Sequence, residues 1–140
     1  MLKNVPKILS PELLKALCEM GHGDEITIGD ANFPAYQYHD KVIRADGLKG
    51  TDLLDAILKM IPLDTYSDYN IILMNTINGD PTPDIWEEYE KIALENDKNA
   101  KIIHLDRYDF YDRVKKSFCV VESGEERIYA NIIIRKNVIK

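Results

Sequence analysis

The chain has 140 residues, of which 45% are hydrophobic and 30% are charged, and its formal net charge of −6 corresponds to a pI near 5.0. This composition is typical of one globular domain, residues 1–140, and it argues against a nucleic-acid partner because phosphate binding needs a basic surface. Apolar runs such as residues 71–74 are far shorter than the roughly 20 residues of a membrane span, and no signal-like segment opens the chain, so we expect no membrane partner and a cytoplasmic location.

Helical and strand patterns alternate along the chain. Ser10 followed by Pro11 is typical of a helix start, and apolar residues then recur at helical spacing until Gly21, which can end the helix in a left-handed conformation. The other elements are predicted from capped helical periodicity and from short apolar runs. The predicted strands are 25–29, 42–43, 70–74, 101–105, 118–122 and 127–134, and the further predicted helices are 51–61, 83–93 and 109–117.

The order of these elements predicts the fold class. Strands that alternate with helices favour a three-layer α/β domain with a mainly parallel sheet. The last two predicted strands flank Ser123 and Gly124, a pair typical of a turn. We therefore expect a C-terminal antiparallel hairpin at the end of an otherwise parallel arrangement.

A histidine between two glycines is the most distinctive local feature. His22 lies between the first predicted helix and the first predicted strand, and Asp30 follows the carboxyl end of that strand. Ligands of open α/β sheets bind beyond the carboxyl ends of strands, and an imidazole with a carboxylate can move protons near neutral pH. The plainer interpretations are that His22 is an exposed or capping residue and that Asp30 simply ends its strand.

Other polar residues lie at the ends of predicted strands elsewhere in the chain, and one polar run lies inside the last strand. Arg44 with Asp46 and Arg107 lie at strand ends, whereas the run Tyr129-Ala130-Asn131 belongs to the predicted strand 127–134 and directly precedes its apolar residues 132–134. Such side chains exchange hydrogen bonds with hydroxyl groups, and an aromatic ring covers apolar sugar carbons, so a polyhydroxylated ligand is favoured. No phosphate-binding or dinucleotide glycine pattern is present. Arg44 and Asp46 could equally form a surface ion pair of small energetic value.

The remaining histidines and the cysteines show no metal-ligand spacing. His39 lies in a polar loop and His104 in a predicted buried strand, and we expect structural roles for both. Cys18 and Cys119 are interpreted as small buried hydrophobic residues rather than as nucleophiles. We therefore expect no metal site.

Five segments together resemble one protein family, the ribose pyranases and L-fucose mutarotases. The segments are Glu-Met-Gly-His-Gly-Asp-Glu at 19–25, Asp-Ala-Asn-Phe-Pro-Ala at 30–35, Val-Ile-Arg-Ala-Asp-Gly at 42–47, Arg107 with Phe110-Tyr111, and Tyr-Ala-Asn-Ile-Ile at 129–133. The resemblance runs in one order from Met1 to about Val138. The forms Gly-His-Gly-Asp-Glu and Arg-Ala-Asp-Gly, together with Arg107, look like the fucose branch.

The resemblance implies a cofactor-free isomerase that interconverts the anomers, and the pyranose and furanose forms, of a free monosaccharide. It also implies a homo-oligomer, with a decamer among the expected assemblies and sugar sites near subunit boundaries. By the resemblance, His22 matches the proton donor, whereas the sugar-binding positions are Asp30, Arg107, Tyr129, Ala130 and Asn131, with Tyr111, Arg44 and Asp46 as secondary candidates.

Mutarotation opens the sugar ring by protonating the ring oxygen while the anomeric hydroxyl loses its proton. We expect His22 to supply the first proton, and Asp30 to orient His22 or to hold a hydroxyl. The general base stays open, with Tyr111 and a bound water among the candidates. The favoured function is L-fucose mutarotation, and the alternatives are D-ribose pyranase activity, non-catalytic sugar binding and a purely structural oligomerisation module.

Overall fold

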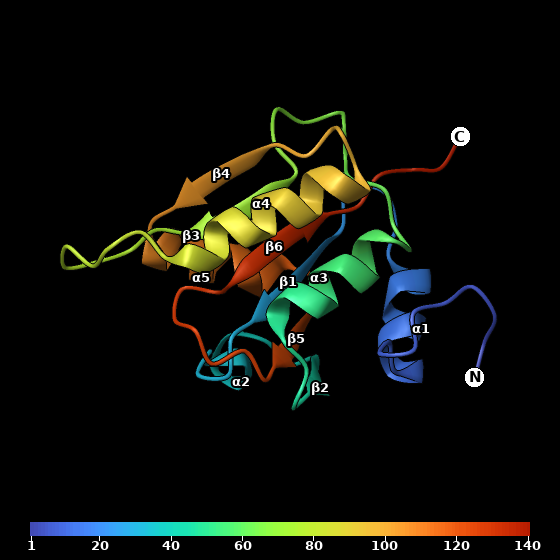
Figure 1. The fold of residues 1–140 in the computed structure, drawn as a ribbon, viewed down its shortest axis with the longest axis horizontal. Coiled ribbons are helices and arrows are strands. Elements are labelled where there is room, and N and C mark those ends of the chain that lie inside the picture. Colours follow the sequence, from blue (N-terminus) through green and yellow to red (C-terminus); the bar gives the residue numbers. More distant parts are fainter.

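A six-stranded sheet in the order β2-β5-β1-β6-β3-β4 forms the middle layer of the computed structural model, which describes residues 1–140 (Figure 1). Strand β6 runs antiparallel to its neighbours β1 and β3, and the other five strands share one direction. The strands are β1 (Glu25–Gly29), β2 (Val42–Ala45), β3 (Ile71–Met74), β4 (Ile102–Leu105), β5 (Cys119–Ser123) and β6 (Ile132–Arg135).

Five helices cover the two faces of this sheet (Figure 1). One face carries α1 (Pro11–Glu19), α3 (Gly50–Leu58) and α4 (Asp84–Asn96), and the other carries α2 (Ala35–Tyr38) and α5 (Arg107–Lys116). The first helix begins as predicted, because the Ser10 side chain accepts a hydrogen bond from the Leu13 amide and Pro11 occupies the first turn. The predicted three-layer α/β fold with a mainly parallel sheet is confirmed.

The central strands are apolar throughout because both of their faces are buried. In β6, Ile132 and Ile134 pack into the core beneath α1, α3 and α4, whereas Ile133 points into the core beneath α2 and α5. None of these three isoleucines is exposed to solvent. A strand in this position cannot show alternating polarity, and for this reason it appears in the sequence as a continuous apolar run.

The predicted C-terminal hairpin is wrong. Strand β1 lies between β5 and β6, so the last two strands do not pair with each other. The chain instead crosses the end of β1 through residues 124–131, where the Ala31 amide donates to the Glu125 carbonyl at 2.8 Å. The predicted strand 127–134 therefore shrinks to β6, and its first five residues become part of this crossing connection. The expected antiparallel pairing exists, but its partners are β1 and β3.

Three smaller expectations are also corrected. Met20 ends α1 in an extended conformation, and it is Gly23 rather than Gly21 that takes a positive φ, of 84°. Cys18 is exposed, whereas Cys119 is buried as predicted. His104 is exposed because β4 is an edge strand. None of the helices has the length and apolar character that a membrane crossing requires.

Candidate active site

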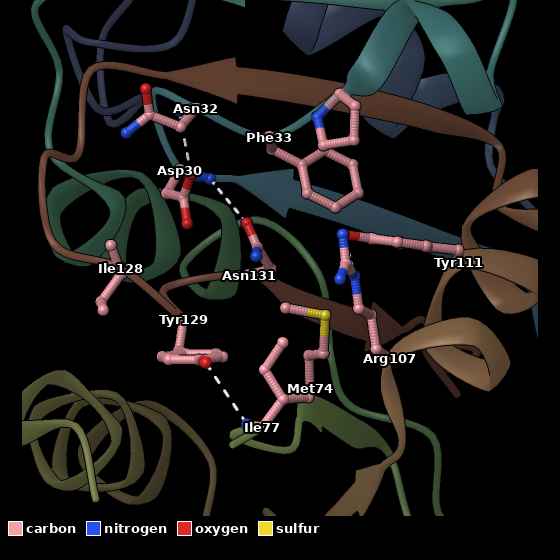
Figure 2. Close-up of a pocket in the computed structure, with 11 residues that line it drawn as sticks. Asp30, Asn32, Phe33, Met74, Ile77, Arg107, Tyr111, Ile128, Tyr129 and Asn131 are labelled. Carbon is pink, nitrogen blue, oxygen red and sulfur yellow. Dashed lines mark hydrogen bonds between the residues drawn. The ribbon is translucent and has the colours of Figure 1, made fainter. Parts of the chain in front are cut away.

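The carboxyl ends of the parallel strands and the start of β6 meet at one edge of the sheet, called here the pocket edge. Asp30 follows β1, Arg107 begins α5 directly after β4, and Asn131 precedes β6. Together with Tyr129 from the crossing connection, these residues line a cavity of about 270 Å³ (Figure 2). Four of the predicted site residues, which are far apart in the sequence, are thus brought together, and the volume suits one small ligand.

Asp30 is the carboxylate of this cavity and is only 5% exposed. Its Oδ1 accepts from the Asn32 amide at 2.9 Å, and its own amide donates to Asn131 Oδ1 at 2.8 Å (Figure 2). Burial raises the pKa of Asp30, and hydrogen bonds with the amides of Asn32 and Ala130 and with the Asn131 side chain offset only part of this rise. A buried carboxyl with a raised pKa at the wall of a cavity is suited to proton transfer.

Helix α4 holds the backbone of residues 129–131 in place. Trp86 Nε1 donates to the Tyr129 carbonyl and Tyr89 Oη donates to the Ala130 carbonyl, both at 2.9 Å. Tyr129 has a φ of 58°, a left-handed conformation that is costly for a tyrosine and that needs such support. Ala130 is buried and does not line the cavity. Its contribution to the site is its backbone amide, which forms a hydrogen bond with Asp30.

The phenol of Tyr129 is tied to the loop that follows β3. It donates to Asp80 Oδ2 at 2.5 Å and accepts from the Ile77 amide at 3.3 Å. The hydrogen bond to Asp80 raises the pKa of Tyr129, so the phenol is neutral at neutral pH and can both donate and accept. No sequence pattern pointed to Asp80, because it lies in a loop rich in glycine and proline.

Arg107 and Tyr111 form a second polar wall from the first turns of α5. Arg107 Nε donates to Tyr111 Oη at 3.2 Å, and the guanidinium carbon lies 5.6 Å from the centre of the Tyr111 ring. The other guanidinium donors remain free to bind hydroxyl groups. Tyr111, predicted as a secondary residue, therefore lines the cavity and orients Arg107.

An apolar wall completes the cavity. It consists of Phe33, Pro34, Met74, Ile77 and Ile128. Phe33 packs directly over Gly29, where an added Cβ would lie only 2.7 Å from the Phe33 Cβ, so a larger residue at position 29 would displace this wall. Apolar side chains suit the carbon face of a sugar and a methyl substituent, whereas the polar walls suit hydroxyl groups.

Arg44 and Asp46, the other secondary candidates, do not line the cavity. They flank the end of β2, the edge strand farthest from β4, where Arg44 Nη2 lies 2.6 Å from Asp46 Oδ1. Both side chains are at least half exposed. This is the surface ion pair of the alternative interpretation, and such pairs contribute little to stability.

His22 lies at the opposite edge of the sheet, before the first residue of β1, in what is called here the histidine edge. Its Nε2 is 3.1 Å from Asp64 Oδ1, and its ring centre is 4.8 Å from that of Tyr66. The five residues of β1 span four steps of roughly 3.3 Å each, so this strand alone separates the two edges by about 13 Å. Within one chain, therefore, His22 does not reach the cavity and Asp30 does not orient it.

The contact between His22 and Asp64 could not be predicted from the sequence. The two residues are 42 positions apart, and Asp64 lies in a loop without periodicity. Asp64 is nevertheless 1% exposed and also contacts Arg135, the last residue of β6, with 3.3 Å between Arg135 Nε and Asp64 Oδ2. No three His, Cys, Asp or Glu side chains gather closely enough to hold a metal ion.

Known proteins similar to this chain share both its length and its fold. A model of the RbsD / FucU transport protein family matches residues 3–139. The fucose mutarotase of Mus musculus is 47% identical, over 99% of this chain and 95% of its own. The crystal structure of the fucose mutarotase from Streptococcus pneumoniae in complex with L-fucose has a TM-score of 0.94 and 47% identity, over 99% of this chain and 100% of its own. Bacillus subtilis RbsD complexed with D-ribose, at 23% identity and a TM-score of 0.76 over 100% of both chains, shares the fold.

Proposed function

The chain belongs to the RbsD / FucU family, and we propose that it acts as an L-fucose mutarotase whose sugar site is the cavity at the pocket edge. Fucose mutarotase, an isomerase, is the activity of relatives that are 47% identical over almost the entire chain. The observation that supports this use of the cavity is the buried carboxylate of Asp30 facing Arg107 across a space with one apolar wall. The cytoplasmic location stays a prediction.

We assign the two proton transfers to different residues. The imidazolium of His22 gives its proton to the ring oxygen, and Asp30 takes the proton of the anomeric hydroxyl. The bond between the anomeric carbon and the ring oxygen then breaks, and the aldehyde forms. The aldehyde then rotates about the bond that joins it to the neighbouring carbon. The two proton transfers run in reverse, and the ring closes to give the other anomer. General acid–base catalysis of this kind typically accelerates a reaction by about 10²–10⁴-fold.

His22 would come from a second copy of the chain. The cavity is lined by no imidazole, while the side chain of His22 is 39% exposed at the other edge of the sheet. A contact that places the histidine edge of one copy over the pocket edge of the next joins two different surfaces, and such head-to-tail contacts form a ring when the rotation between copies closes. This arrangement is compatible with the homo-oligomer expected from the sequence, for which a decamer remains a prediction.

Magnetisation-transfer NMR at the anomeric protons tests the activity. We expect the protein to accelerate exchange between the L-fucose anomers, and the effect on the ring forms of D-ribose measures the alternative pyranase activity. His22→Ala should reduce the enhancement about 10²–10⁴-fold while fucose still binds, because His22 contributes a proton and not a pocket wall. Undiminished exchange in this variant would refute the role of His22, and binding by the wild type without any exchange would favour the non-catalytic alternative.

A mixing experiment tests the shared site. His22→Ala and Asp30→Asn chains are each expected to be inactive alone. When they are unfolded and refolded together, about a quarter of the sites should combine an intact His22 with an intact Asp30 if neighbouring copies share a site. The control is each variant refolded alone. If the mixture remains as inactive as the separate variants although mixed oligomers form, each site must lie within one chain.

A further inference from the structure

The histidine edge holds a buried carboxylate with a defined set of partners. Asp64 is 1% exposed, and its Oδ1 accepts from the Tyr66 amide at 3.1 Å and lies 3.1 Å from His22 Nε2. Its Oδ2 lies 3.3 Å from Arg135 Nε. Burial alone would raise the pKa of Asp64, but the Tyr66 amide, His22, Ser67 and Arg135 together outweigh burial and hold this pKa below its usual value. Asp64 is therefore ionised at neutral pH.

This carboxylate determines which nitrogen of His22 carries the hydrogen. An ionised carboxylate can only accept hydrogen bonds, so the neutral imidazole must present Nε2–H to Asp64. Its Nδ1 then has a free lone pair and makes no hydrogen bond within the chain. The Tyr66 ring, inclined at 58° to the imidazole, packs against it and restricts its rotation.

The turn around His22 needs a glycine for its backbone conformation and is joined to the end of β6. Gly23 has a φ of 84°, and its amide donates to the Lys136 carbonyl at 2.8 Å, which joins the turn to the end of β6. A larger residue at position 23 would be strained by this φ, whereas its Cβ would lie 3.7 Å from Arg135 Nη2, which is an ordinary contact distance. The turn therefore places His22 beside Asp64, whose charge is compensated by the guanidinium of Arg135, a contact with no role in the cavity at the pocket edge.

We propose that Asp64 is the positioning residue for His22: it fixes the Nε2–H tautomer and so makes Nδ1 the atom that exchanges a proton with the sugar ring oxygen. This inference rests on the proposed function, in which His22 acts on fucose. In the protonated state, Nδ1–H gives its proton to the ring oxygen while Nε2–H stays bonded to Asp64. When the ring closes, Nδ1 takes the proton back. Asp64 itself stays ionised throughout.

The test is the nearly isosteric substitution Asp64→Asn, combined with ¹⁵N NMR of the His22 ring. The amide of asparagine can donate to Nε2 and thereby favour the Nδ1–H tautomer. We expect the wild type to show the Nε2–H tautomer when neutral and the variant to shift to Nδ1–H. At neutral pH the exchange rate per site should fall at least about tenfold, with little change in the fucose dissociation constant, since Asp64 acts on the tautomer of His22 and is not among the residues that line the cavity.

Asp97→Asn is the matched control. Asp97 lies at the end of α4, and its side chain accepts a hydrogen bond at 3.0 Å from the amide of Leu63, the residue before Asp64. Asp97 does not contact His22. This variant should keep both the tautomer and the exchange rate of the wild type. A purely structural role of Asp64 would lower the thermal stability without changing the tautomer of the folded protein.

The outcomes separate this inference from the proposed function. Wild-type exchange and an Nε2–H tautomer in Asp64→Asn would overturn the inference, even if His22→Ala is inactive. An Nδ1–H tautomer in the wild type would by itself overturn the inference. This part of the test does not depend on whether Asp64→Asn folds. Full activity of His22→Ala would instead refute the role of His22 in the proposed function, while the ring ¹⁵N shifts would still report whether Asp64 sets the tautomer.

Discussion

The two edges of the sheet use the same residue type in opposite ways. At the pocket edge, Asp30 is surrounded by amides and apolar side chains, and burial raises its pKa. At the histidine edge, Asp64 is buried to a similar degree, but the Tyr66 amide, His22 and Arg135 lower its pKa. The comparison shows that burial alone does not determine the state of a carboxylate. The pocket edge holds a carboxyl suited to gaining and losing a proton, and the histidine edge holds one suited to remaining charged.

The largest effect on sugar binding should come from Arg107 at the pocket edge. Arg107→Met removes the free donors of the guanidinium and should weaken L-fucose binding about 10- to 100-fold, as expected for a charged hydrogen bond. Isothermal titration calorimetry measures this loss. The matched control is Arg44→Met, which removes an exposed arginine outside the cavity and should bind fucose like the wild type. Equal losses in both variants would place the ligand elsewhere at this edge.

Stability should respond to the two carboxylates with opposite signs. Because the pKa of Asp30 is raised by folding, its charged form costs stability above that pKa, and Asp30→Asn should stabilise the protein at neutral pH by about 0.5–2 kcal/mol. Because the pKa of Asp64 is lowered by folding, its charged form contributes stability, and Asp64→Asn should destabilise by about 1–3 kcal/mol at neutral pH.

Urea unfolding at several pH values, at one fixed protein concentration, checks these signs. The gain of Asp30→Asn should disappear as the pH falls to the ordinary carboxyl pKa of 3.8, at which the wild-type group is protonated in the folded state. The deficit of Asp64→Asn should persist to that pH and shrink only below it, as the folded-state carboxyl becomes protonated. Changes of the same sign at neutral pH would contradict the contrast between the two edges.

A smaller effect is expected from the support behind the pocket. Trp86→Phe removes the donor to the Tyr129 carbonyl and leaves the left-handed backbone less well held. Fucose binding should weaken about two- to tenfold, the range of one neutral hydrogen bond. Glu87→Gln, at the next and exposed position of α4, is the control and should bind normally. An unchanged affinity in Trp86→Phe would mean that Tyr89 and Asp80 are sufficient to hold residues 129–131.

The sequence predicted the alternating elements, the α/β class and the family. These follow from local signals: the Ser10 cap, apolar runs such as Ile71–Met74, and polar residues placed after strands. Because parallel strands end at a common edge, the positions of Asp30 and Arg107 after predicted strands indicated one side of the sheet, whereas Asn131 was predicted inside a strand and was grouped with them by the resemblance. The turn between two glycines and the resemblance identified His22 as a candidate, and its place before the first predicted strand put it at the end opposite Asp30, but the sequence did not show which residues it would contact there.

Only the tertiary structure decided the strand order and the partners of His22. A turn signal at Ser123 suggested a hairpin, yet β1 lies between the last two strands, because pairing depends on which apolar surfaces fit together and not on proximity in the sequence. The contact between His22 and Asp64 likewise joins loops that are 42 residues apart. Helix and strand patterns arise from interactions between near neighbours and can be predicted from a single sequence, whereas contacts between distant loops exist only once the sheet has set their positions.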